Sequence, residues 1–294
     1  MDSQLKSVRL AIAAFAVIAA IPNFGLAQSP TYSDVVYDNE HSSQCMDVYL
    51  AQSDKPTPAV VYIHGGGWRG GSKKGVPGWL MRFVNDGKLS VVAVEYRFTD
   101  VATHPAQVND CLRSIQFVRQ NAEKWNIDSQ RLGVTGGSAG GHLSAYVALH
   151  DDVASAASDD PVEKQSSRVA CAVSFAGPTD WSLLSSVEHG HPAYRQLIGY
   201  APGTPAAELK AELVKDVSPI SFVSKDDPPI MQVHGDKDDI VPLQHAAKLH
   251  ERLQATNVKS ELVVIPGGNH GVAGAGDKVA VRATEFVQQY LLAP

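Results

Sequence analysis

The 294-residue chain is poor in cysteine, and the three that it has, Cys45, Cys111 and Cys171, include no CxxC pair. A structural zinc site is therefore not indicated, because such sites take their ligands at short, recurring spacings. An odd number of cysteines allows at most one disulfide within the chain, and the sequence does not decide which pair, if any, forms it. Cys111 and Cys171 lie in apolar stretches, so we expect both to be buried as small hydrophobic side chains.

Positive charge is also scarce. The chain has 25 Lys and Arg residues against 31 Asp and Glu residues, a formal net charge of −6. This balance gives no reason to expect a nucleic acid or an anionic membrane as a partner. The sequence contains no G-x-x-x-x-G-K followed by Ser or Thr, which disfavours a phosphate-cradling loop, and we expect no cofactor.

Long hydrophobic runs are confined to the N-terminus. Residues 10–21 form an unbroken apolar run of twelve, which follows Lys6 and Arg9 and precedes the small residues around Ala27. This pattern predicts a signal peptide at residues 1–27 and hence a secreted or periplasmic protein. The run is short for a bilayer span, although an uncleaved N-terminal anchor is the alternative. We expect no membrane span in the mature chain.

Strand-like and helix-like segments alternate from about residue 33 onward. Continuous apolar runs, as at residues 59–63 and 91–94, fit strands that helices cover on both faces. Further strands are expected at 169–175, 229–233 and 262–265, and extended segments at 33–37 and 45–51 are expected to pair antiparallel at one edge. Apolar residues at helical spacing predict helices over 108–122 and 279–291, although Arg119 falls on the apolar stripe of the first and Phe117 lies off it. The alternation predicts an α/β fold with a mostly parallel central sheet flanked by helices.

One segment breaks this rhythm. About fifty residues separate the strand that ends near Ala176 from the strand that begins near Pro229, which is too many for a plain loop. We expect a small cap over about residues 177–226, inserted above the active-site edge of the sheet. Residues 28–294 would then form a single catalytic domain.

The strongest motif is centred on Ser138, in the sequence Gly-Gly-Ser-Ala-Gly of residues 136–140. It follows an apolar run and precedes a helix-compatible stretch, as in a G-x-S-x-G nucleophile elbow. Glycines suit this position because the strand-to-helix turn is too tight for flanking side chains. His-Gly-Gly-Gly at residues 64–67 lies upstream, and Asp238 and His270 follow downstream, so that nucleophile, acid and histidine occur in the order of α/β-hydrolases.

Five motifs together carry a family resemblance. They are His64-Gly65-Gly66-Gly67-Trp68, Glu95-Tyr96-Arg97, residues 136–142, residues 234–242 and Gly268-Asn269-His270-Gly271. With them the chain resembles the α/β-hydrolases of the esterase/lipase group with an HGGG oxyanion motif, which contains hormone-sensitive-lipase-like carboxylesterases and feruloyl- and acetylxylan-esterase-like enzymes. The tryptophan after the glycines and the compact cap favour the feruloyl-esterase-like branch.

The resemblance implies a role for each matching residue. Ser138 would be the nucleophile, His270 the general base and then acid, and Asp238 the group that orients His270. The oxyanion would be held by backbone N–H groups, those of Gly66, Gly67 and Ala139. Trp68 and Trp181 are candidates for lining the acyl or alcohol pocket, with ordinary packing as the alternative.

The remaining histidines and acids are expected to serve the structure. His64 would bond backbone near the oxyanion loop, and His142 and His234 would either support the site from behind or lie in the core. His189 and His191 fit a solvated cap loop better than a metal site, because other ligands at recognisable spacing are missing. Of the acids beside Asp238, Asp236 is expected to bond loop backbone and Asp239 to cap the following helix.

These features predict a secreted serine carboxylic-ester hydrolase that acts through an acyl-enzyme on short-chain acyl, acetyl or feruloyl esters, either small or attached to a polymer. A serine peptidase or amidase on the same fold is the alternative, because the same triad can attack amides. A non-catalytic binding module is a third interpretation, but such a module would be expected to have lost the nucleophile or the histidine. The sequence does not indicate an oligomeric state.

Overall fold

A single eight-stranded sheet organises the computed structural model, which describes residues 29–185, 191–272 and 276–293; the predicted signal peptide lies outside these ranges. The strands are β1 (Tyr32–Val36), β2 (Cys45–Tyr49), β3 (Thr57–Ile63), β4 (Ser90–Val94), β5 (Ile127–Gly137), β6 (Cys171–Phe175), β7 (Ile230–Gly235) and β8 (Ser260–Ile265). Their order across the sheet is β1-β2-β4-β3-β5-β6-β7-β8. β2 pairs antiparallel with β1 and β4, and the other neighbours are parallel. The predicted sheet and its antiparallel edge pair are therefore confirmed.

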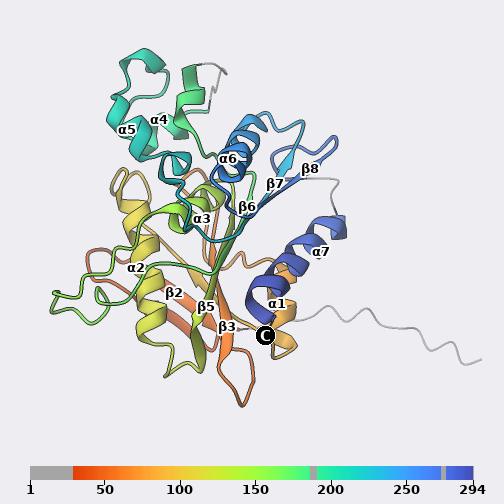
Figure 1. Ribbon diagram of the computed structural model, residues 1–294. Helices are drawn as coiled ribbons and strands as arrows, with labels where there is room; N and C mark the ends of the chain where they lie inside the picture. Colours follow the sequence, from red (N-terminus) through yellow and green to blue (C-terminus); the bar gives the residue numbers. More distant parts are fainter. Residues whose placement is uncertain (1–28, 186–190, 273–275, 294) are drawn as a thin grey trace, which may run out of the picture.

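Helices cover both faces of the sheet, which explains why the central strands are continuously apolar. One face carries α2 (Ala106–Gln120), α3 (Ala139–Leu149) and α6 (Gln244–Ala255), and the other carries α1 (Gly78–Asn85) and α7 (Gly276–Val287), which continues into a π-helical turn at Gln288–Leu292 (Figure 1). No helix within the described ranges is long and apolar enough to cross a membrane. The predicted α/β architecture is the observed one.

Helix α2 shows how the exceptions to its apolar stripe are accommodated. Arg119, which interrupts the stripe, donates from Nε to the Ser129 carbonyl at 3.1 Å and from Nη2 to the Arg168 carbonyl at 2.7 Å, and its Nη1 bonds the Ser166 carbonyl. The guanidinium therefore ties the start of β5 to the segment that precedes β6. Phe117 packs against Trp125, with ring centroids 6.0 Å apart.

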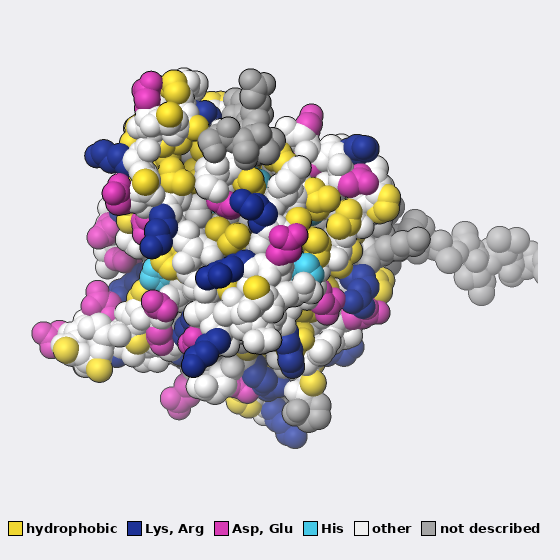
Figure 2. Space-filling model, turned by 45° about the horizontal axis from the view of Figure 1, so that its top comes forward, with side chains coloured by type: hydrophobic (Ala, Val, Ile, Leu, Met, Phe, Trp, Pro, Cys, Tyr) yellow, Lys and Arg dark blue, Asp and Glu magenta, His cyan; other side chains and the backbone are white. Residues whose placement is uncertain are grey.

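The chain between β6 and β7, where the sequence predicts a cap, forms short helical pieces. They are the 3-10 turns at Trp181–Ser185, Ala206–Glu208 and Pro219–Phe222 and the helices α4 (Ala193–Leu197) and α5 (Ala211–Asp216). These pieces lie together beyond α3 at one end of the sheet (Figure 1). Figure 2 turns this end forward and shows hydrophobic side chains interspersed with basic and acidic ones across it.

The cysteines remain unpaired. Cys111 and Cys171 are buried, as expected, and Cys45 is half-buried on β2. All three are free thiols, so the described part of the chain contains no disulfide. Burial raises the pKa of the Cys171 thiol to about 12, which keeps it protonated and unreactive at neutral pH.

A first prediction concerns the close approach of β3 to Gly136, at the end of β5. A Cβ on Gly136 would lie 2.2 Å from the Ile63 carbonyl oxygen and 2.6 Å from the Gly140 carbonyl, and backbone cannot swing away as a side chain could. We expect Gly136→Ala to lower the free energy of unfolding by about 3 kcal/mol, measured by urea denaturation. Gly78→Ala at the start of α1 is the control, because a Cβ there would have nothing within 4 Å; it should change stability by less than about 1 kcal/mol. Equal midpoints for both variants would contradict the account.

Candidate active site

Ser138 occupies the turn between β5 and α3. Its φ of 56° and ψ of −120° fall in a region that non-glycine residues rarely adopt, at a cost on the order of 1–3 kcal/mol. Two hydrogen bonds hold it there: its N–H donates to the Phe175 carbonyl at 2.8 Å, and its carbonyl accepts from the N–H of His142 at 2.9 Å. The strained turn presents the serine hydroxyl at the edge of the sheet, in the geometry that the elbow motif predicts.

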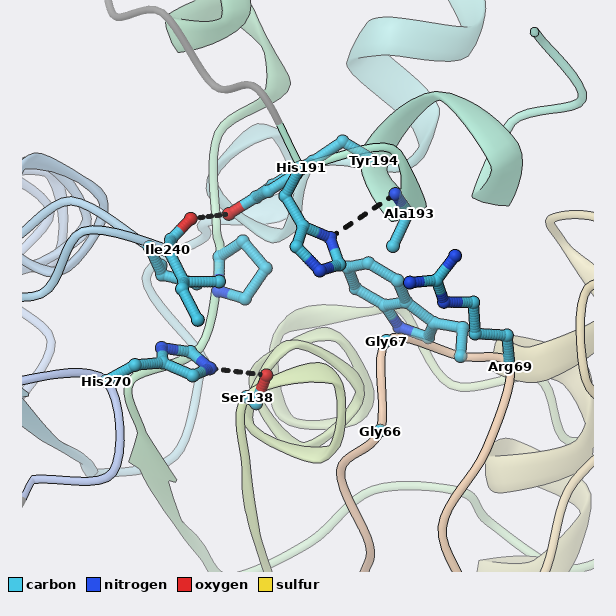
Figure 3. A pocket seen from close by; sticks show the side chains of 12 residues that line it. Gly66, Gly67, Arg69, Ser138, His191, Ala193, Tyr194, Ile240 and His270 are labelled. Carbon is cyan, nitrogen blue, oxygen red and sulfur yellow. Dashed lines mark hydrogen bonds between the residues drawn. The ribbon is translucent and has the colours of Figure 1, made fainter. Parts of the chain in front are cut away.

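The structure brings the three predicted residues into one hydrogen-bonded chain. Ser138 Oγ lies 2.8 Å from Nε2 of His270 (Figure 3). On the other side of the ring, Nδ1 of His270 lies 2.9 Å from Oδ2 of Asp238. A carboxylate only accepts hydrogen bonds, so Nδ1 carries the proton and Nε2 is left to accept from the serine hydroxyl. This tautomer is the one that can take a proton from Ser138.

Asp238 is held by more than His270. Its side chain is buried, and its Oδ1 accepts from the backbone N–H groups of Ile240 and Val241 at 3.0 and 2.9 Å. Nε2 of His234 donates to the Val241 carbonyl at 2.6 Å and lies 3.3 Å from Oδ2 of Asp238. Burial opposes ionisation of the carboxyl, but the hydrogen bonds from His234, His270 and Val241 outweigh it and hold the pKa of Asp238 well below its usual range. Asp238 therefore stays ionised at neutral and mildly acidic pH.

The two neighbouring acids behave differently from each other. Asp236 accepts the N–H of Gly267 at 2.7 Å, which fits the predicted backbone role. The predicted capping role of Asp239 is wrong, because α6 begins only at Gln244 and no side chain caps its N-terminus. The intervening residues through Leu243 form a turn that the sequence pattern did not reveal.

The glycine motif packs directly against the elbow. A Cβ on Gly65 would lie 2.6 Å from the Gly137 carbonyl oxygen, and Gly66 and Gly67 have φ of +118° and +63°. Side chains would be excluded at the first position and strained at the other two. Within the described ranges, the N–H groups of Gly66, Gly67 and Ala139 have no hydrogen-bond acceptor, so all three remain available beside Ser138.

His64 fixes the start of this loop. It is buried, its Nδ1 bonds the Gly65 carbonyl at 2.7 Å, and its Nε2 lies 2.8 Å from Oε1 of Glu95. The ring stacks on Tyr96 at 4.5 Å, and the Tyr96 hydroxyl donates to the His64 carbonyl at 3.0 Å. The expectation that His64 bonds backbone is confirmed, and its carboxylate partner comes from the Glu-Tyr-Arg motif.

Trp68, His142 and Val217 link the loop, α3 and the segment after β6. The Trp68 indole N–H donates to Nδ1 of His142 at 3.2 Å, and Nε2 of His142 donates to the Val217 carbonyl at 2.8 Å. Burial lowers the pKa of His142 to about 3, so the ring is neutral and can accept on one nitrogen while donating from the other. His142 and His234 both lie in the core, as expected.

A pocket of about 330 Å³ opens beside the serine hydroxyl. Its lining consists of Gly66, Gly67, Trp68, Arg69, Ser138, Pro178, His191, Ala193, Tyr194, Ile240, Val241 and His270. Of the two tryptophans considered for the pocket, Trp68 belongs to this lining and Trp181 does not. Trp181 is 1% exposed and packs behind Trp68, with ring centroids 5.7 Å apart, because its indole N–H is turned toward the Tyr194 carbonyl at 3.2 Å.

Sequence reasoning missed several lining residues. Arg69 directly follows Trp68 in the sequence, and this position beside a candidate lining residue is the signal that could have pointed to it. Tyr194 lies on the five-residue helix α4, which is too short to show a periodic pattern, and His191 and Ile240 lie in irregular segments. His191 was expected in a solvated loop. His189 lies outside the described residues. No cluster of three His, Cys, Asp or Glu side chains suited to a metal ion occurs in the described ranges.

The mostly parallel sheet, the helices on both faces and the Ser-His-Asp chain at its edge define an α/β-hydrolase fold. The chain belongs to the BD-FAE family, whose model matches residues 46–253. The resemblance to esterases that the motifs carry is thereby confirmed.

Similar proteins include one named as a probable carboxylic ester hydrolase, LipM of Mycobacterium tuberculosis, 29% identical over 242 residues. The match covers 80% of this chain and 54% of LipM, so the chain spans about half the length of that relative. An acetyl ester-xyloside bifunctional hydrolase from Caldicellulosiruptor lactoaceticus has a TM-score of 0.73 and 27% identity, covering 89% of this chain and 96% of its own. A propionate-bound esterase from Thermogutta terrifontis has a TM-score of 0.65 and 25% identity, covering 87% and 92%.

A second prediction separates the three acids. Asp238→Asn presents an amide to His270, which disfavours the tautomer that accepts from Ser138, and we expect kcat for 4-nitrophenyl acetate to fall by about 10⁴, as in a well-studied serine protease triad. In Asp236→Asn the amide oxygen can still accept the Gly267 N–H, and Asp239 is exposed to solvent. Both Asn variants should therefore retain kcat within about threefold and the free energy of unfolding within about 1 kcal/mol. Near-normal kcat in Asp238→Asn would show that the acid is misassigned.

Proposed function

We propose that this protein is a serine carboxylic-ester hydrolase that works through an acyl-enzyme. The observation that carries the proposal is the continuous hydrogen-bonded chain from Ser138 through His270 to Asp238, which opens onto a pocket with unpaired backbone N–H groups. Membership of the BD-FAE family and the esterase relatives support the same activity.

In the acylation half of the reaction, Ser138 Oγ attacks the ester carbonyl carbon while Nε2 of His270 takes the hydroxyl proton. The negative charge on the carbonyl oxygen is held by the N–H groups of Gly66, Gly67 and Ala139. The positive end of α3, which begins at Ala139, adds to this stabilisation. His270 then gives its proton to the leaving alcohol oxygen, and the C–O bond breaks to leave an acyl-serine.

Deacylation repeats these steps with water. A water molecule attacks the acyl carbon and gives a proton to Nε2 of His270, and the Ser138 oxygen leaves and recovers that proton. The ionised Asp238 stabilises the imidazolium that forms in each half, because its own pKa is held so low that it does not take the proton.

We infer that the substrates carry short acyl groups. The pocket holds about 330 Å³, and Tyr194 and Ala193 of the segment after β6 close one side of it. Each added methylene gains about 0.8 kcal/mol only while apolar wall remains to cover it. The propionate-bound and acetyl-ester-hydrolysing neighbours agree with a short acyl group. With the predicted signal peptide, we propose a secreted or periplasmic enzyme whose residues 28–294 form the catalytic domain and about 177–226 its cap.

A third prediction tests the activity and the pocket size. Across 4-nitrophenyl esters, kcat/KM should be highest between acetyl and butyryl and should fall by more than about tenfold at palmitoyl. Acetylated xylan and methyl ferulate test polymer-linked and feruloyl substrates, and an aminoacyl 4-nitroanilide should react at least about 100-fold more slowly. Ser138→Ala protein prepared in parallel sets the background. Fastest turnover of palmitoyl esters would refute the short pocket, and anilide turnover equal to that of esters would indicate an amidase.

A further inference from the structure

The charge of the pocket lining differs from that of the whole chain. Of the described lining residues, Arg69 carries a positive charge, His191 and His270 are neutral bases, and none is acidic. The chain as a whole has more acidic than basic residues, 31 against 25. The basic character therefore belongs to this site and does not follow from composition.

Arg69 is held at the pocket without a counter-charge. Its Nη1 donates to Oε1 of Gln196 on α4 at 3.1 Å, and the partner is a neutral amide. Within the described ranges, no carboxylate forms an ion pair with Arg69. A guanidinium has five N–H donors, so most remain free for a ligand while Gln196 restricts the side chain.

His191 contributes a second donor above the same space. The Ala193 N–H donates to Nδ1 of His191 at 3.4 Å, which leaves the proton on Nε2. Figure 3 shows the ring reaching toward Gly67 and Arg69, on the other side of Ser138 from His270. Burial lowers the pKa of His191, and the positive charge of Arg69 lowers it further, so the ring is a neutral donor at neutral pH.

We propose that Arg69 and His191 form a carboxylate-binding subsite, and that the preferred substrates are esters whose acyl part carries a second, ionised carboxyl group. The planar guanidinium matches a carboxylate, and the His191 N–H can bond one of its oxygens. The acyl part is favoured because the leaving alcohol oxygen must reach His270, whereas Arg69 lies across Ser138 from it (Figure 3). This inference rests on the proposed esterase function.

The test compares anionic esters with neutral esters of the same shape in a pH-stat at pH 7.5. Monoethyl succinate is paired with ethyl 4-methylpentanoate for the acyl part, and acetoxyacetate is paired with isobutyl acetate for the alcohol part. We expect the acyl pair to give a kcat/KM ratio of about ten in favour of the anion, which should decrease when salt is raised from 0.05 to 0.5 M. The alcohol pair should give a ratio near or below one.

Each variant is judged by the ratio of its kcat/KM values for the anionic and the neutral ester. A change in its overall activity affects both values and does not obscure the result. Arg69→Gln should bring the acyl ratio to about one. Arg69→Lys should keep part of the preference for the anion, because lysine supplies the positive charge but not the planar pair of donors. Arg82→Gln removes the same charge from an exposed position on α1 and should keep the wild-type ratio.

A wild-type acyl ratio of one or less, or an unchanged ratio in Arg69→Gln, would overturn the proposal. A preference found only with acetoxyacetate would also contradict it, because the carboxylate would then belong to the alcohol part. Failure to hydrolyse either neutral ester would instead contradict the esterase function, so the two failures are distinguishable.

Discussion

The carbonyl oxygen of Ile63, at the end of β3, lies 2.2 Å from where a Cβ on Gly136 would be and 2.0 Å from where one on Gly140 would be. β3 and the elbow can approach this closely only because both positions lack side chains. The same approach places Gly65 against the Gly137 carbonyl. The glycine motif of residues 64–67 and the turn that carries Ser138 thus meet in one backbone contact. The geometry of the site depends on this contact.

Buried histidines convert this contact into a fixed geometry. Neutral His142 accepts from Trp68 and donates to Val217, so it connects the glycine motif of residues 64–67 and the Trp68 that follows it to the segment after β6, through the helix that follows the elbow. His64 holds the beginning of the glycine motif, and His234 holds the turn between Asp238 and Val241 through the Val241 carbonyl. Each ring is buried with a polar partner, as a buried polar group must be. The strain at Ser138 is therefore maintained by surroundings that leave the turn little freedom.

The sequence was sufficient to predict the sheet and the residues that the structure brings into one hydrogen-bonded chain, because both have recognisable sequence patterns. Continuous apolar runs predict β3 and β4, and the order of Ser138, Asp238 and His270 around glycine-rich turns predicts their meeting. The residues that form the pocket wall have no such sequence pattern. Whether Trp181 faces the pocket or packs behind Trp68 is decided by the tertiary contact of its indole with the Tyr194 carbonyl, which no periodicity encodes. The turn before α6 likewise depends on backbone bonds to Asp238 that local propensity does not reveal.

The central claim is that Ser138 is an activated nucleophile. The most direct measurement is covalent labelling by a fluorophosphonate, followed by digestion and mass spectrometry to locate the adduct. The account predicts one label per chain on the peptide that contains Ser138, no label in Ser138→Ala, and strongly slowed labelling in His270→Ala, which keeps the hydroxyl but loses the base. Full-yield labelling of Ser138→Ala, or an adduct on another residue of the wild type, would contradict it.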